Sequence, residues 1–181
     1  MTDEITLLEQ LKNVQTKEVA FRELISQYKE RLYWHIRKIV ISHDDADDVL
    51  QNTFIKVFRS IDTFKQDSKL YSWMYRIATN EAITFINKRA KHRNIDITEL
   101  YSELSADLKS DVYFSGSEIQ IILQKAIATL PQKQQLVFNM KYFDNIKYEE
   151  LSEILDTSVG ALKASYFHAV KKIETFVKAN Q

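Results

Sequence analysis

The stretch that decides the fold is residues 148–163, YEELSEILDTSVGALK. Over residues 148–155 the apolar positions recur at helical spacing and predict a short helix with one buried face. Three polar residues, 156–158, interrupt the pattern, and the last of them, Ser158, is a suitable N-cap for a second helix. Two helices joined by so short a turn must cross steeply, which is the geometry of the helix-turn-helix motif.

The second helix of this motif is expected over residues 159–178. Its predicted buried stripe consists of Val159, Leu162, Tyr166, Ala169, Val170 and Ile173. The outward face carries small residues first and basic residues later: Gly160, Ala161, Lys163, Ala164, Phe167, His168 and Lys171. Small residues let a helix approach base edges, and lysines reach phosphates or guanine, so this face predicts DNA binding. The alternative is an antiparallel helical hairpin with an ordinary solvated face.

Composition excludes several classes of protein. The 181 residues include two Gly and one Pro, too few turn formers for an all-β sandwich, and the glycines lie too far apart for a phosphate-binding loop. The absence of Cys excludes disulfides, cysteine zinc sites and thiol nucleophiles, and it fits a reducing compartment. Apolar runs are too short for a membrane span. We therefore expect an all-α cytoplasmic protein.

The apolar periodicity divides the chain into two helical domains. Residues 1–93 predict an N-terminal helical bundle, and residues 118–181 predict the C-terminal helix-turn-helix domain. Over residues 94–117 the periodicity weakens and acidic residues dominate, which indicates a linker that can contain some local helix. The formal net charge is zero, so phosphate attraction is modest, and a DNA-binding protein of this kind would need help from a partner.

One predicted helix of the N-terminal domain begins with a cluster of acids. Ser42 is expected to cap this helix, which runs to about Ser60. Its first turns contain Asp44, Asp45, Asp47 and Asp48. Acids in a first turn complement the helix dipole, but four of them exceed what capping requires. A surface for a basic partner is therefore the alternative interpretation.

A basic, aromatic block follows in the same domain. It covers a polar loop over residues 62–69 and a predicted helix over residues 70–90, with a basic tail to Arg93. Aromatic rings among cations are typical of proteins that bind single-stranded DNA. Some of these rings also fit a core: Phe85 and part of Trp73 lie on the predicted buried stripe. Three residues are expected outside that stripe: Tyr71, Tyr75 and Arg76.

Three strings together carry a resemblance to a known family. They are DADDVLQNTFIKVF at residues 45–58, WMYRIATN at residues 73–80 and the helix-turn-helix at residues 148–163. In this order they resemble bacterial sigma factors of the extracytoplasmic function (ECF) group of the sigma-70 family. The resemblance covers about residues 17–93 and 118–178, and three motifs at family spacing are far more specific than one. It implies an RNA polymerase subunit that directs promoter-specific transcription initiation.

The resemblance also implies a role for individual residues. Contact with the β′ clamp helices of core polymerase is implied for Asp47, Asp48 and Gln51. Contact with the minus-ten element is implied for Phe64, Lys65, Lys69, Trp73, Arg76, Asn80, Lys88 and Arg89. The minus-thirty-five element would be read in the major groove by Gly160, Ala161, Lys163, Ala164, Phe167, His168 and Lys171.

The partners that the resemblance implies are core polymerase, through its β′ and β subunits, promoter DNA in duplex and melted form, and an anti-sigma factor. The acidic linker resembles the family segment that threads through polymerase toward the RNA path. No catalytic residue, cofactor, metal ion or membrane insertion is expected. The chain departs from the family pattern at Asp156, where Gly is usual, and at Ser165 and His168, where arginines are frequent, so the promoter sequence is not predictable.

Two other functions are compatible with parts of the sequence. The first is a helix-turn-helix regulator that acts without polymerase and whose N-terminal domain senses a ligand or dimerises. The second is a helical enzyme, whose candidate groups would be the aspartates of residues 44–48 and the histidines His35, His43, His92 and His168. No two histidines share i, i+4 spacing, and the aspartates lack the Gly and terminal Glu of a calcium loop. The enzyme is therefore the weakest of the three hypotheses.

Overall fold

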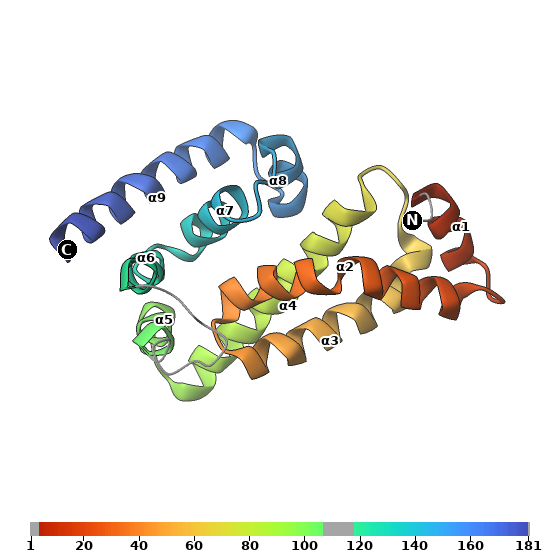
Figure 1. Cartoon of the computed structure of the whole chain (residues 1–181), viewed down its shortest axis with the longest axis horizontal. Coiled ribbons are helices and arrows are strands. Elements are labelled where there is room, and N and C mark those ends of the chain that lie inside the picture. Colours follow the sequence, from red (N-terminus) through yellow and green to blue (C-terminus); the bar gives the residue numbers. More distant parts are fainter. Residues whose placement is uncertain (1–3, 107–117, 181) are drawn as a thin grey trace.

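The computed structural model describes residues 4–106 and 118–180, and the regular elements within these ranges are all helical (Figure 1). The α-helices are α1 (Glu4–Lys12), α2 (Lys17–Val40), α3 (His43–Ser60), α4 (Leu70–Arg93), α5 (Ile97–Ala106), α6 (Glu118–Ala128), α7 (Gln132–Tyr142), α8 (Tyr148–Leu155) and α9 (Val159–Ala179), with a short 3₁₀-helix, η1 (Ile61–Thr63). This confirms the predicted all-α class. None of the helices within these ranges is long and apolar enough to cross a membrane.

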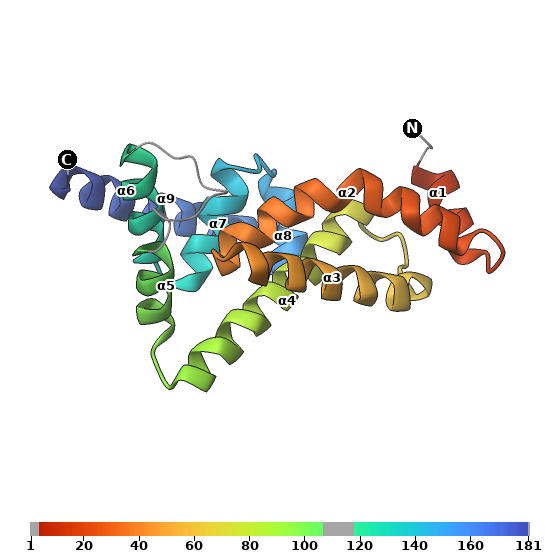
Figure 2. The same cartoon turned by 60° about the horizontal axis from the view of Figure 1, so that its bottom comes forward.

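Helices α2, α3 and α4 pack against one another as a bundle, and α1 packs on α2 at one end (Figures 1 and 2). Side-chain hydrogen bonds to backbone N–H groups mark where two of these helices begin. The side chain of Ser42 accepts a hydrogen bond from the backbone N–H of Asp45 at 3.4 Å, which confirms the predicted cap of α3. The first backbone N–H of α4, that of Leu70, donates to the carboxylate of Glu4 at 3.2 Å, so α1 satisfies an N–H group that α4 itself cannot.

Part of the segment expected as a linker is an ordered helix. Helix α5 packs on α4 and α6, and its residues Leu100 and Tyr101 are buried beside Ile86, Ala90 and Ala128. Residues 94–117 were expected to be a linker that can contain local helix, and residues 97–106 form such a helix, with enough apolar surface to build this small core. The remaining part of that segment, residues 107–117, lies outside the described residues.

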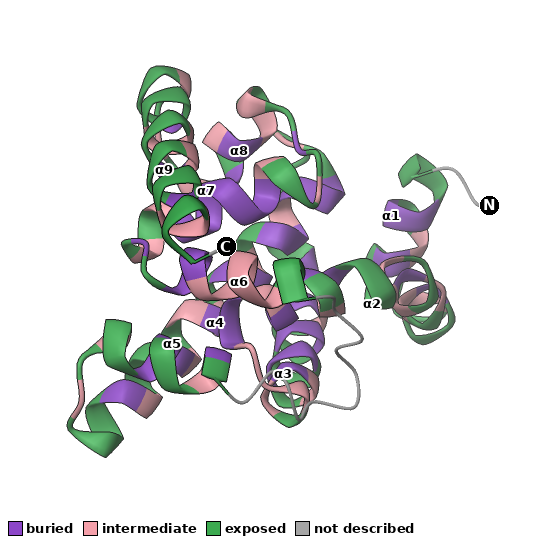
Figure 3. Cartoon of the chain, turned by 60° about the vertical axis from the view of Figure 1, so that its left-hand side comes forward, coloured by how far each residue is buried: buried purple, intermediate pink, exposed green. Residues whose placement is uncertain are grey.

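The helices of the C-terminal half share a second core. Helices α6, α7 and α9 and the loop between α6 and α7 contribute the buried residues Ala126, Ile127, Leu130, Phe138, Ala169 and Ile173. Helix α8 packs against both α9 and α4. Helix α9 keeps most of its length exposed (Figure 3).

The two halves are packed together in a closed arrangement. The largest core cluster runs from α1–α4 into the C-terminal half, where it includes Leu136, Val137, Met140, Ile146, Leu151, Ile154 and Leu162. Sequence reasoning left a compact and an extended arrangement open. The structure is compact because α7 packs on α2 and α8 packs on α4.

Helix α4 is buried on more sides than its periodicity predicts. Tyr71 and Tyr75 were expected outside the core stripe, but Tyr71 is 9% exposed and Tyr75 is fully buried. The expectation was wrong because α2, α3 and α8 all pack against α4, so that little of its first half faces solvent. Burial accordingly raises the pKa of Tyr71 to about 12, and the hydroxyl group of Tyr75 donates to the backbone carbonyl of Arg31.

Candidate nucleic-acid and polymerase interfaces

The turn between α8 and α9 has the geometry that the sequence predicts. Asp156 ends α8 in the left-handed conformation, with φ of 48° and ψ of 52°. A short polar side chain tolerates this conformation better than most, so Asp replaces the usual Gly here. Ser158 then caps α9, its hydroxyl oxygen accepting from the backbone N–H of Ala161 at 3.3 Å. Residues 148–179 therefore fold as a helix-turn-helix.

The outward face of α9 presents every residue that was predicted to read duplex DNA. The exposed members are Gly160, Ala161, Lys163, Ala164, Phe167, His168 and Lys171. A Cβ atom added to Gly160 would meet nothing within 4 Å, so packing inside the chain does not require glycine there. The ammonium group of Lys171 lies 4.5 Å from the centroid of the Phe167 ring, and Phe167 is 54% exposed. This face combines small residues, one aromatic ring and cations on a single accessible surface.

The acidic start of α3 divides into two parts. Asp45 is half-buried and forms an ion pair with Arg89 of α4, so it serves the packing of the bundle. Asp48 and Gln51 are exposed. A carboxylate oxygen of Asp47 lies 3.6 Å from Nε2 of His43. The residues predicted to contact polymerase are therefore accessible on one helix.

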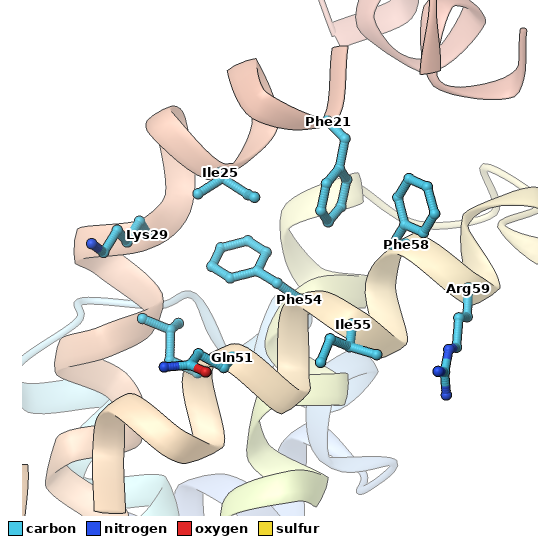
Figure 4. Close-up of a pocket in the computed structure, with 9 residues that line it drawn as sticks. Phe21, Ile25, Lys29, Gln51, Phe54, Ile55, Phe58 and Arg59 are labelled. Atoms are coloured by element: carbon cyan, nitrogen blue, oxygen red, sulfur yellow. The ribbon is translucent and has the colours of Figure 1, made fainter. Parts of the chain in front are cut away.

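An apolar groove lies beside Gln51, between α2 and α3 (Figure 4). Its volume is about 710 Å³, and Lys29 and Arg59 flank its apolar lining. The apolar lining consists of Phe21, Ile25, Leu50, Phe54, Ile55 and Phe58. Sequence reasoning missed this groove because Phe54 and Phe58 fit the core stripe of α3. The exposed Ile55, next to them, was the available signal.

The residues predicted for the minus-ten element occupy different environments. Lys65, Asn80 and Lys88 are exposed, and Trp73 is half-buried. Phe64 is only 4% exposed and packs on Trp73, with ring centroids 5.2 Å apart. In this arrangement the Phe64 ring belongs to the core of the bundle, and its implied contact with a base stays a prediction.

Two of the basic residues predicted for the minus-ten element, Lys69 and Arg76, contact the C-terminal half of the chain. The ammonium group of Lys69 lies 2.6 Å from the carboxylate of Glu150 on α8. This hydrogen bond raises the pKa of Lys69 and lowers that of Glu150. The guanidinium group of Arg76 donates to the backbone carbonyl of Glu153, with 3.0 Å from Nε. The structure thus places α8 directly over the first turns of α4.

Comparison with known proteins identifies the family. Residues 24–92 match the family model of Sigma-70 region 2, and residues 120–173 match that of Sigma-70, region 4. The chain is 30% identical over 168 residues to the ECF RNA polymerase sigma-E factor of Haemophilus influenzae, with 88% of each chain covered. The chain belongs to the ECF group of the sigma-70 family. It is therefore an RNA polymerase sigma factor, which directs promoter-specific transcription initiation.

Other relatives of this sigma factor agree with the assignment. The ECF RNA polymerase sigma-E factor of Escherichia coli strain K12 is 28% identical over 186 residues, which cover 98% of this chain and 95% of that protein. Among solved structures, CnrH in complex with the cytosolic domain of CnrY superposes with a TM-score of 0.72 at 20% identity over 98% of this chain and 99% of CnrH.

The sigma factor RpoE from Bartonella quintana, solved with the anti-sigma factor NepR, gives a TM-score of 0.67 at 20% identity. The match covers 89% of this chain and 98% of RpoE. At this identity the two structures show a shared fold. The matches to regions 2 and 4 favour the sigma factor over a regulator that acts without polymerase.

Proposed function

We propose that this sigma factor reads the minus-thirty-five element with the outward face of α9. The observation that carries the proposal is that the predicted reading residues are exposed together, behind a turn fixed by Asp156 and Ser158. Lys163 and Lys171 supply contacts to phosphate or guanine, and Phe167 offers a ring to a thymine methyl group. With Ser165 and His168 in place of arginines, base readout depends on Lys163 and on apolar contacts.

The minus-ten element is proposed to lie along α4 and the loop before it. Lys65, Lys69, Arg76, Asn80 and Lys88 would contact the DNA, and Trp73 would stack on a base of the melted strand. Lys65, Asn80 and Lys88 support this proposal because they are exposed. Lys69 and Arg76 support it because they are exposed apart from their contacts with α8. Phe64 takes the role of a platform under Trp73, because their rings are in contact. Arg89 reaches DNA only if its ion pair with Asp45 opens.

Core polymerase is proposed to dock on α3 through Asp47, Asp48 and Gln51. The acids of α3 suit a basic partner surface, and the apolar groove beside Gln51 extends the same surface. A polymerase-bound factor need not hold DNA alone, which accounts for a formal net charge of zero. In this scheme residues 1–93 bind polymerase and the minus-ten element, and residues 118–181 bind the minus-thirty-five element.

We also infer that this sigma factor has an anti-sigma partner and acts in the cytoplasm without catalytic activity. CnrH was solved with the cytosolic domain of CnrY, and RpoE with the anti-sigma factor NepR. Sigma factors are initiation factors, and the chemistry of RNA synthesis belongs to polymerase. The apolar groove between α2 and α3 offers an anti-sigma factor an accessible surface.

In vitro transcription with core polymerase on a promoter library tests the proposed function. The purified chain is expected to direct transcripts from a defined subset of promoters. Lys163→Ala should lose most of that activity, whereas Lys178→Ala, an exposed change in the last turn of α9, should keep it. A chain that neither binds core polymerase nor directs any transcript would overturn the proposal.

A further inference from the structure

Helix α1 holds both ends of the loop that precedes α4, and it packs beside η1 where this loop begins (Figure 1). At the first end, the ammonium group of Lys12 donates to the backbone carbonyl of Phe64 at 3.4 Å. At the second end, the carboxylate of Glu4 accepts from the backbone N–H of Leu70 at 3.2 Å. We call residues 64–69, which lie between these two contacts, the minus-ten loop.

A third contact joins the start of α2 to η1. The ammonium group of Lys17 lies 2.9 Å from the carboxylate of Asp62, whose side chain is 59% exposed. An ion pair this open to water contributes little by itself. The two hydrogen bonds to backbone groups, from Lys12 and to Glu4, are therefore the contacts that can fix the path of the minus-ten loop.

The middle of the minus-ten loop is not packed tightly on α1. A cavity of about 410 Å³ lies between them, and its walls include Leu8 of α1 and Asp67 of the loop. Within the loop, Gln66 has a left-handed φ of 62°, which residues other than glycine rarely adopt. A segment in such a conformation depends on surrounding contacts to keep its shape. The contacts at its two ends therefore decide where the minus-ten loop lies.

Glu4 supplies an acceptor that α4 lacks. Lys69 occupies the N-cap position of α4, and its side chain makes no capping hydrogen bond. The carboxylate of Glu4 acts as the cap from another helix, and its negative charge complements the positive end of the α4 dipole. The first turn of α4 leads directly to Trp73, whose backbone N–H donates to the carbonyl of Lys69 at 3.1 Å. The position of the Trp73 ring thus depends on Glu4.

We propose that Glu4 is a positioning residue for the opening of the minus-ten element. It caps α4 from α1, and so holds the minus-ten loop and Trp73 in the arrangement that captures the melted strand. Lys12 supports the same loop at Phe64. This inference rests on the proposed function of α4 and the loop before it. All of these residues belong to the N-terminal half, so the positioning does not depend on where the C-terminal half lies.

The test compares Glu4→Ala with Glu9→Ala, each as the full chain assembled with core polymerase. Glu9 is an exposed acid of the same helix, so the two variants have equal net charge. The template is a promoter that the wild-type chain transcribes, with 2-aminopurine in its minus-ten element as a fluorescent reporter of unstacked bases. The ratio of open to closed promoter should fall about fivefold in Glu4→Ala, as expected for the loss of a helix cap. It should stay at the wild-type value in Glu9→Ala.

Three further measurements separate positioning from folding. Glu4→Gln should recover most of the lost opening, because its amide oxygen accepts the same hydrogen bond. On a template whose minus-ten element is already unpaired by mismatches, Glu4→Ala and Glu9→Ala should give equal transcript yields, since the strands no longer have to be separated. Their affinities for core polymerase should also be equal. Should Glu4→Ala not fold, Lys12→Met repeats the comparison at the other end of the loop, with the exposed Lys178→Met as its control.

Two outcomes would overturn the positioning role. Equal opening by Glu4→Ala and Glu9→Ala would show that the cap from α1 does not act on the minus-ten element. An equal loss of transcripts on the paired and the mismatched template would show that Glu4 serves folding alone. Transcription by the wild-type chain scores the proposed function, and the ratio between the two variants scores this inference, so the two failures are distinguishable.

Discussion

The guanidinium group of Arg89, on α4, pairs with the carboxylate of Asp45 in the first turn of α3. Their side chains are 33% and 18% exposed, so the pair is partly shielded from water. It joins the helix proposed to contact polymerase to the helix proposed to contact the minus-ten element. Arg89 is therefore first a packing residue of the bundle.

This pair gives the first prediction. Arg89→Ala should lower the free energy of unfolding by about 1–2 kcal/mol, because Asp45 loses a charged hydrogen-bond partner. The exposed neighbour Lys88→Ala is the control and should change stability by less than about 0.5 kcal/mol. Urea denaturation measures both. Equal stability of the two variants would mean that the ion pair contributes nothing in solution.

The second prediction concerns the turn before α9. Asp156 adopts a left-handed conformation, with φ of 48°. Asp156→Val should cost about 1–2 kcal/mol, since a β-branched residue is strained in this region, whereas Asp156→Gly should fold normally. Thermal unfolding distinguishes the two variants. Duplex binding by the Val variant should also weaken, because the turn no longer holds the start of α9 in one orientation. If Val and Gly behaved alike, the turn would not require this conformation.

The third prediction separates stability from DNA binding at one position. Gly160 is exposed in the first turn of α9, and an added Cβ would lie in open space. Gly160→Ala should therefore stabilise the free protein by about 0.5–1 kcal/mol. The same methyl group would stand where the helix approaches base edges, so promoter affinity should fall. A rise in both quantities would place the DNA away from this end of α9.

The fourth prediction is a pH dependence that His35 causes. Burial lowers the pKa of His35, which therefore stays neutral in the folded chain. Below the ordinary pKa of about 6.5, His35 binds a proton in the unfolded chain but not in the folded chain. The free energy of unfolding therefore decreases as the pH is lowered, by up to about 1.4 kcal/mol per pH unit. His35→Asn should flatten this dependence between neutral and mildly acidic pH.

The control for that experiment is His92→Asn, at an exposed position of the last turn of α4. It should leave the slope of stability against pH at the wild-type value. Asp144, between α7 and α8, responds in the other range: burial opposes its ionisation, but the His35 ring 3.5 Å away and the charge of Lys38 outweigh this and hold its pKa below the ordinary value. Its contribution is therefore complete at neutral pH and is lost only in strong acid.

Sequence reasoning worked where the signal is local. The cap at Ser42, the turn from Asp156 to Ser158 and the exposed face of α9 each depend on a few neighbouring residues, and the structure confirms these elements. Side-chain identity at such positions sets the backbone directly, through a capping hydroxyl group or tolerance of the left-handed region. The helix-turn-helix could therefore be predicted before any tertiary contact was known.

The misses come from contacts between distant segments. Tyr71 and Tyr75 are buried because α2, α3 and α8 all pack against α4, and the periodicity of one helix cannot reveal several such neighbours. Phe64 was expected at the DNA surface, but its ring packs on Trp73 and belongs to the largest core cluster. The meeting of His35 with Asp144 has no local signature at all, since the two residues belong to different halves of the chain.

The continuous cluster that joins α1–α4 to Leu151, Ile154 and Leu162 has a calorimetric consequence. Segments that share one set of packed side chains lose them together, so the free chain should melt in a single cooperative transition. A chain whose halves have separated would instead give two heat-absorption peaks, each belonging to a smaller and less stable unit. The number of peaks thus reports whether the two halves are joined or apart.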